Sequence, residues 1–233
     1  MAVAAHQDTQ ASSTSEDPGA TAARDALDAL SLTSLMSSRL CHDLVNPVGA
    51  LSSGLDVLVD PEMDEEMRRD AMDLVQSSTD KAVAALKFAR LAYGLSGGLE
   101  HDVSLQEARD LLMGVYAHSK ASLDWRVNDL SAPKKEAKAL LLLAHAAMDC
   151  VPRGGAVAVT GGEGAYEITA DGARVLLNDG VDRALSGDVT EITPKHAPLY
   201  LVGVIAREGG GAARARRDGE RVVMSLQVRR AAA

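Results

Sequence analysis

Apolar residues recur at spacings of three and four between residues 37 and 58, a pattern that predicts a helix with one apolar seam. Such a seam is typical of a helix that packs against other helices. We expect this first helix to run from about residue 23 to residue 59. Pro47 lies inside it and removes one internal hydrogen bond, so we expect a local bend there. The seam comprises Ser37, Cys41, Leu44, Val48, Leu51, Leu55 and Leu58.

A second helix is predicted from about residue 64 to residue 93, after the helix-breaking sequence Asp60-Pro61-Glu62. Two long helices joined by a short turn form an antiparallel hairpin, and a single hairpin leaves its seam half exposed. Two hairpins from two chains close that seam as a four-helix bundle, which predicts a homodimer. The expected buried stripe of the second helix comprises Met67, Ala71, Leu74, Ser78, Ala82, Ala85, Ala89 and Ala92.

The second half of the chain alternates short apolar runs with helical patterns, which predicts an α/β sandwich with a mixed sheet. Ser104 and Glu107 form a capping box that begins a third helix, expected to end near residue 119. Further helices are expected over 133–150, 181–185 and 198–207. Strands are expected over 123–127, 156–159, 166–169 and 174–177, and in a final hairpin over 212–216 and 221–228.

Three regions follow from this division of the chain. Residues 1–22 are rich in Ala, Ser, Thr, Gln and Gly, so we expect them to be disordered. The helical hairpin spans 23–95, and the α/β domain spans 100–229, after a glycine-containing linker.

Composition narrows the classes of function. The net charge of −9 argues against nucleic acid as a main partner. No apolar run approaches the roughly 18 residues of a membrane-spanning helix, and the N-terminus does not resemble a signal peptide. Cys41 and Cys150 form no spacing motif, so we expect reduced thiols and a cytoplasmic protein without a membrane partner.

His42 lies just beside the apolar seam of the first helix. Its neighbours on the same stripe are small or polar, so this face is expected to meet solvent or a partner. An imidazole at the edge of a bundle, next to the carboxylate of Asp43, suits a reaction with a macromolecule. The expected partner-binding residues on this face are Ser38, Val45, Gly49 and Ser53.

The order His42-Asp43, two residues, then Asn46-Pro47 resembles the phospho-acceptor H-box of histidine kinases. The longer string CHDLVNPVGALSSGLDVL is similar to the ChpT-type histidine phosphotransferases of alphaproteobacteria. The resemblance covers residues 23–228. It implies a dimeric four-helix bundle followed by a degenerate Bergerat-type domain, the ATPase-like α/β fold of histidine kinases.

The resemblance also implies roles for the residues around the H-box. His42 is the expected nucleophile, and Asp43 is expected to orient or deprotonate its imidazole. Arg39, one turn earlier, is expected to stabilise the transferring phosphoryl group. Asn46, one turn later, is expected to form a hydrogen bond with that group or within the bundle.

The residues with which histidine kinases bind nucleotide are not present at the matching positions of this chain. The kinase position of the magnesium-binding Asn falls on Ala146, that of its paired Asn on Leu142, and that of the Lys on Asp149. A methyl group cannot bind Mg²⁺, which requires oxygen ligands. The adenine-reading Asp-x-Gly-x-Gly motif is incomplete at Asp171-Gly172 and at Asp179-Gly180. We therefore expect no nucleotide, cofactor or metal site in this chain.

The expected activity is that of a protein histidine phosphotransferase in a phosphorelay. A phosphoryl group would pass from the receiver aspartate of a hybrid histidine kinase through His42 to a response regulator receiver. The receiver would supply the Mg²⁺. Two alternatives remain open from the sequence. One is an active soluble histidine kinase that uses ATP, and the other is a non-catalytic dimeric scaffold that binds receivers.

Overall fold

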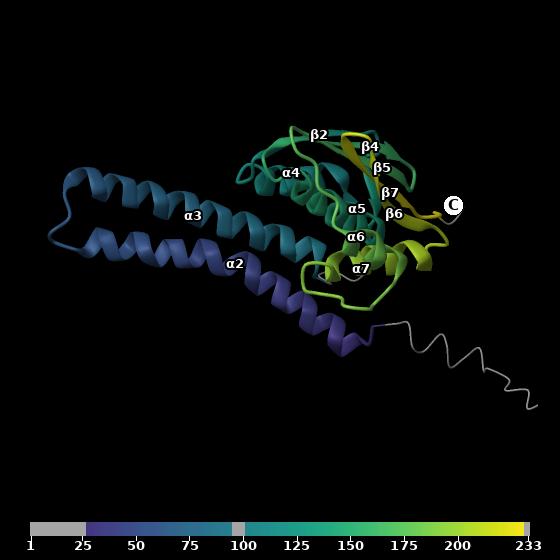
Figure 1. Cartoon of the computed structure of the whole chain (residues 1–233), viewed down its shortest axis with the longest axis horizontal. Coiled ribbons are helices and arrows are strands. Elements are labelled where there is room, and N and C mark those ends of the chain that lie inside the picture. The colour runs from purple at the N-terminus through teal and green to yellow at the C-terminus, as the bar shows by residue number, and fades with distance from the viewer. Residues whose placement is uncertain (1–26, 95–100, 231–233) are drawn as a thin grey trace, which may run out of the picture.

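The computed structural model describes residues 27–94 and 101–230. A long helical hairpin projects from a compact α/β part, and the helices of the α/β part lie between the hairpin and the sheet (Figure 1). This is the predicted order of a helical hairpin followed by an α/β sandwich. The expected disordered segment, 1–22, lies outside the described residues.

The hairpin consists of α2, Ala29–Val59, and α3, Glu65–Ala92. The first helix begins later than the expected residue 23, because the Asp28 side chain accepts a hydrogen bond from the Ser31 N–H and caps it. Asp64 caps α3 in the same way, through the Met67 N–H. Helix α2 continues through the buried Pro47 and changes direction along its length (Figure 1).

Close packing fixes the register of the two hairpin helices. Gly54 is buried, and a Cβ atom at this position would lie only 2.7 Å from the Val75 Cγ2 and 3.2 Å from the Ala71 carbonyl oxygen. At the closed end, the Arg68 guanidinium donates to the carbonyl oxygens of Leu58, Asp60 and Met63. Glycine therefore allows α2 and α3 to approach closely, and Arg68 holds the loop between them.

The α/β part contains four α-helices and a short 3₁₀ turn within the described residues. The helices are α4, Leu105–Tyr116; α5, Lys134–Ala147; α6, Asp179–Ser186; and α7, Ala197–Glu208. The 3₁₀ turn, Met148–Cys150, extends α5. The predicted capping box is confirmed, since the Ser104 hydroxyl accepts from the Glu107 N–H at the start of α4.

The main sheet has five strands in the order β2-β4-β5-β7-β6. Only the β2–β4 pair is parallel, because α5 connects these two strands and returns the chain to the same end of the sheet. One face packs against the helices through residues such as Val157, Ile168 and Met224. The strands are β2, Ala121–Val127; β4, Gly155–Gly162; β5, Ala165–Asp171; β6, Ala212–Asp218; and β7, Arg221–Gln227.

Two details of the α/β part differ from the sequence prediction. The predicted strand over 174–177 is wrong, because these residues pair with none of the five strands of the sheet. The segment instead packs the buried Val175 against the core, and the Leu176 N–H donates to the Cys150 carbonyl oxygen. The structure also adds a two-stranded ribbon of β1, Asp102–Ser104, and β3, Ser131–Pro133, which are too short to give a periodic signal.

The hairpin and the α/β part share one hydrophobic core. Phe88 and Ala92, in the last turns of α3, are buried in the same cluster as α5 and the sheet. The Leu27 N–H, just before α2, donates to the Tyr200 hydroxyl on α7 at 2.9 Å. The two parts are thus joined at the base of both hairpin helices.

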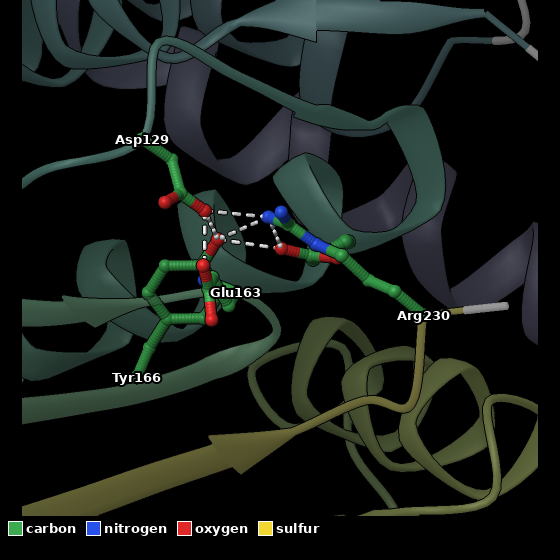
Figure 2. Close-up of polar contacts among 5 residues, drawn as sticks. Asp129, Glu163, Tyr166 and Arg230 are labelled. Carbon is green, nitrogen blue, oxygen red and sulfur yellow. Dashed lines mark hydrogen bonds and ion pairs between the residues drawn. The ribbon is translucent and has the colours of Figure 1, made fainter. Parts of the chain in front are cut away.

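A polar cluster in the α/β part joins α5 and β5 to the residues that follow β7. Arg230 and Asp129 converge with Tyr166 and the Glu163 backbone (Figure 2), and the cluster also contains Glu136. The Arg230 Nε and Nη2 donate to the two oxygens of Glu136 at 3.0 and 2.7 Å, although Glu136 is only 1% exposed. The Tyr166 hydroxyl donates to Glu136 at 2.5 Å. A buried charge on α5 is therefore paired with the residues that follow β7.

Both cysteines lie in the described part of the chain and are free thiols, as expected, with Cys41 exposed and Cys150 buried. Burial raises the pKa of the Cys150 thiol to about 12, so this group stays protonated at neutral pH. Among the helices of residues 27–94 and 101–230, none has the length and apolar character needed to cross a membrane.

Candidate functional site

His42 lies in the middle of α2 and projects into solvent. Its side chain is 78% exposed, and it also lines the edge of a pocket at the junction of the hairpin and the α/β part. An imidazole with this exposure contributes little to the core. The position therefore permits direct contact between the ring and another macromolecule.

Asp43 and Arg39 form an ordered pair beside His42. The Arg39 Nε donates to the Asp43 Oδ2 at 2.9 Å, and these side chains are only 14% and 25% exposed. The other carboxylate oxygen, Oδ1, lies 3.7 Å from the His42 Nδ1. Asp43 thus lies on the Nδ1 side of the ring, beyond hydrogen-bond distance, and no hydrogen bond or ion pair within the described residues involves Nε2.

The pocket beside His42 has a volume of about 210 Å³ and is bounded by several elements. Asn46 comes from α2, Lys81 from α3, and His118 and Ser119 from the turn after α4. Its apolar wall consists of Leu40, Ala84, Ala85, Phe88, Ala89, Val115 and Met148. A mostly apolar hollow with a few polar groups at its edge is a common form of binding site.

His145, on α5, forms part of the wall of this pocket. Its ring stacks on Phe88 with centroids 4.7 Å apart, and Phe88 meets Tyr93 edge to face. Burial, helped by the positive charge of Arg39, lowers the pKa of His145 to about 4. Burial also raises the pKa of Tyr93 to about 12. Both rings are therefore neutral at pH 7, and neither can act as a cation there.

The expected partner-binding face is open. Ser38, Val45, Gly49 and Ser53 are all exposed, as is Asn46, and a Cβ atom at Gly49 would meet nothing within 4 Å. Gly54 differs, since it is buried against α3. Gly49 thus leaves the surface of α2 open, whereas Gly54 allows α3 to pack closely. The sequence alone did not distinguish these two roles.

The residues at the kinase nucleotide positions form no ligand set for a cation. Leu142 is buried in the core, and the Ala146 side chain is a methyl group. Asp149 is paired with Lys195, whose Nζ lies 3.1 Å from its Oδ2. Among the described residues, no group of three or more His, Cys, Asp or Glu side chains is arranged to hold a metal ion.

Sequence reasoning identified His42 and its neighbours on α2 but missed the rest of the pocket. Lys81, His118 and His145 lie 39 or more residues away in the sequence and carry no motif of their own. Only the packing of α2, α5 and the α4–β2 turn around α3 brings them to His42. The one available signal on α3 was a repeat of four residues, which places Lys81, Ala85 and Ala89 on the same face of that helix.

Residues 105–221, half of the chain, match the family described as "Histidine phosphotransferase C-terminal domain". The chain belongs to this family. The match covers most of the α/β part and does not include α2, which carries His42.

Two known proteins are similar to most of this fold. One curated relative is "Protein phosphotransferase ChpT" from Brucella abortus (strain 2308), which is 36% identical over 133 residues. That match covers 57% of this chain, and the chain matches 62% of the relative's length. A solved structure described as "1.7 Angstrom Structure of a Bacterial Phosphotransferase" gives a TM-score of 0.77 at 29% identity, over 87% of this chain and 98% of that one.

Proposed function

We propose that this chain is a protein histidine phosphotransferase that carries a phosphoryl group on His42. The observation that supports this most directly is the 78% exposed imidazole, with a carboxylate at Nδ1 and Nε2 free. The name of the Brucella relative, a protein phosphotransferase, agrees with this proposal. The donor is the aspartyl phosphate of a hybrid histidine kinase receiver, and the acceptor is the aspartate of a response regulator receiver.

The geometry suits transfer between an aspartate and His42. With the Nδ1 proton facing Asp43, the Nε2 lone pair attacks phosphorus, and the bond from phosphorus to the aspartate oxygen breaks. The receiver carboxylate leaves with the bonding electrons. Asp43 stabilises the positive charge that develops on the imidazole. The acceptor aspartate reverses these steps, and the receiver supplies the Mg²⁺ that offsets charge on the phosphoryl oxygens.

The roles of the neighbouring residues follow from their positions. Arg39 forms an ion pair with Asp43, and its side chain is largely covered. We therefore assign it the role of positioning Asp43, in place of direct contact with phosphate. Asn46 is exposed at the pocket edge and is available to the incoming group. Ser38, Val45, Gly49 and Ser53 form the receiver-binding face, which we name the docking stripe.

The proposed protein acts as a homodimer and without ATP. Apolar side chains on the hairpin, among them Val48 and Leu55, are about half exposed in the single chain, which supports a second hairpin as their partner. The Asp149–Lys195 pair and the methyl group of Ala146 supply no ligand set for Mg-ATP. A cytoplasmic location is consistent with two free thiols and remains a prediction.

The test is transfer from a receiver domain of the same organism that has been phosphorylated with acetyl phosphate. Wild-type protein is expected to acquire acid-labile, base-stable phosphate, and His42→Gln is expected to acquire none while keeping its fold. His101→Gln, at an exposed histidine lining a separate hollow, is the matched control and is expected to behave as wild type. Uptake by His42→Gln at the wild-type rate would show that another residue is the carrier.

Incubation with Mg-ATP separates the alternatives. Self-phosphorylation from ATP would identify a kinase, and binding of receivers without any uptake of phosphate would identify a scaffold. The phosphotransferase is expected to show neither result.

A further inference from the structure

The charges next to His42 are already balanced before any phosphoryl group arrives. Asp43 carries one negative charge and Arg39 one positive charge, and they are joined by the 2.9 Å contact from Nε to Oδ2. A phosphoryl group on His42 adds a charge of about −1.5 to −2 at neutral pH. Because Asp43 lies close to the same ring, that group needs a further cation to offset its charge.

Lys81 is placed to provide this cation. The contacts of Gly54 with Ala71 and Val75 set the antiparallel register of α2 and α3. Because the helices are antiparallel, a step from Gly54 towards the N-terminus of α2 matches an equal step towards the C-terminus of α3. His42 therefore lies level with about residue 85 on α3. Lys81 lies one turn from that level, about 6 Å along the helix axis. An extended lysine side chain covers that length.

The pocket confirms that both side chains border the same space. His42 and Lys81 line one hollow of about 210 Å³. Among its lining residues, all in the described part of the chain, Lys81 is the only lysine or arginine. None of the ion pairs or hydrogen bonds found within residues 27–94 and 101–230 involves it. The stacked His145 is neutral and cannot substitute for it.

We propose that Lys81 is a further catalytic residue, whose ammonium group contacts the phosphoryl oxygens on His42. This inference rests on the proposed function and adds a residue from α3 to a site otherwise built on α2. The bond from Nε2 to phosphorus forms and the bond from phosphorus to the aspartate oxygen breaks as before, and Lys81 contributes charge alone.

The first test uses potassium phosphoramidate, which phosphorylates His42 without a receiver. The bond from Nε2 to phosphorus forms, the P–N bond of the reagent breaks, and ammonium leaves. The pKa of the resulting phosphoryl group is then followed by ³¹P NMR across a pH titration. Lys81→Gln is expected to raise that pKa by about half a unit or more, because a nearby cation favours the dianion. Lys81→Arg is expected to restore the wild-type titration.

Lys87→Gln is the matched control. Lys87 is also exposed on α3 but lines a different hollow, with Arg90 and His101. It is expected to leave the titration unchanged. An unchanged titration in Lys81→Gln, or an equal shift in Lys87→Gln, would overturn the proposal.

The second test measures transfer from a phosphorylated receiver. Lys81→Gln is expected to slow transfer at saturating receiver about tenfold, with the thermal midpoint unchanged and Lys81→Arg within about threefold of wild type. An unchanged rate would overturn a catalytic role. If wild-type protein exchanges no phosphate with any receiver, the proposed function fails, whereas the phosphoramidate titration still decides whether Lys81 contacts phosphohistidine.

Discussion

Arg39 holds Asp43 through a single 2.9 Å contact from Nε to Oδ2, one turn apart on α2. The carboxylate is thereby turned so that its other oxygen lies on the side of the His42 Nδ1. The pair is partly covered while the histidine itself is exposed. In the proposed function, the orientation of the imidazole by Asp43 therefore depends on Arg39, which is paired with Asp43 and not with His42.

This relationship predicts coupled effects of two substitutions. Asp43→Asn is expected to slow phosphoryl uptake about 10²-fold, since a positioned acid–base group typically contributes that much. Arg39→Gln is expected to slow it less, because Asp43 remains but loses its orientation. The double variant is expected to be no slower than Asp43→Asn alone. Single-turnover transfer from a labelled receiver measures all three rates, and strictly multiplicative effects would show that Arg39 acts separately.

The docking stripe predicts a variant that keeps its chemistry and loses its partner. Gly49→Leu is expected to fold normally, since no atom lies within 4 Å of the added Cβ. Loading by phosphoramidate is expected to match wild type, while transfer from a receiver falls at least tenfold because the leucine obstructs its approach. Normal transfer in Gly49→Leu would place the receiver elsewhere. Gly54→Ala is the contrasting variant and is expected to lower the unfolding midpoint, because its Cβ would press on Val75.

The exposed apolar side chains of the hairpin predict a dimer whose interface can be broken without unfolding the chain. Leu55 is 50% exposed, so Leu55→Asp is expected to give folded monomers by sedimentation velocity at micromolar concentration. Leu51 is more covered, and Leu51→Asp is expected to destabilise the hairpin as well. Leu130→Asp, at an 88% exposed position in the α/β part, is the control and is expected to stay dimeric. Monomeric wild-type protein would contradict the dimer.

His145 predicts a loss of stability in mild acid. Its pKa is about 4 in the folded chain and near 6.5 when unfolded, because burial disfavours the charged ring. The unfolded chain therefore binds the extra proton first as pH falls. The contribution is complete above pH 6.5 and is lost towards pH 4, by at most about 3 kcal/mol. Urea unfolding at pH 7 and pH 4.5 measures this loss, and His145→Leu is expected to remove most of it. An equal loss in that variant would assign the effect to other groups.

The cluster shown in Figure 2 predicts that Arg230 matters more for stability than its place near the end of the sequence suggests. Arg230→Gln leaves the charge of Glu136 buried with only the Tyr166 hydroxyl as a hydrogen-bond donor among its present partners. We expect a loss of about 2 kcal/mol, below the usual range for a fully buried pair because Arg230 is 31% exposed on its side chain. Adding Glu136→Gln is expected to recover part of it. Calorimetric unfolding checks both variants, and additive losses would contradict the pairing.

The local features of the fold were predictable from the sequence, whereas its long-range pairings were not. Periodicity located the two hairpin helices, and Ser104 with Glu107 marked the start of α4, because both signals depend on nearby residues. The strand expected over 174–177 failed because a short apolar run does not reveal whether its backbone pairs in a sheet or its side chains pack against the core from a loop. The pairing of Glu136 with Arg230 joins residues far apart in the chain and left no local pattern.

The candidate site shows the same contrast between residues close together in the sequence, which were predictable, and residues from other elements, which were not. The H-box placed His42, Asp43 and Asn46 on one helix, because a motif records residues that are adjacent in sequence. The positioning role that we propose for Arg39 rests on the direction of its guanidinium, which the sequence alone does not indicate. Lys81 and His118 reach the pocket from other elements, so only the packed structure brings them into consideration.

The hydrophobic core that the hairpin and the α/β part share, which includes Phe88 and Ala92, has a consequence for the kinetics of phosphoryl transfer. Because the hairpin and the α/β part are joined at both helix bases, the chain offers one fixed surface around His42. If receivers serve as donor and acceptor, they must occupy that surface in turn. Initial-rate plots at several fixed acceptor concentrations would then be parallel, as in a double-displacement reaction. An excess of unphosphorylated acceptor would inhibit by occupying the site before the donor arrives.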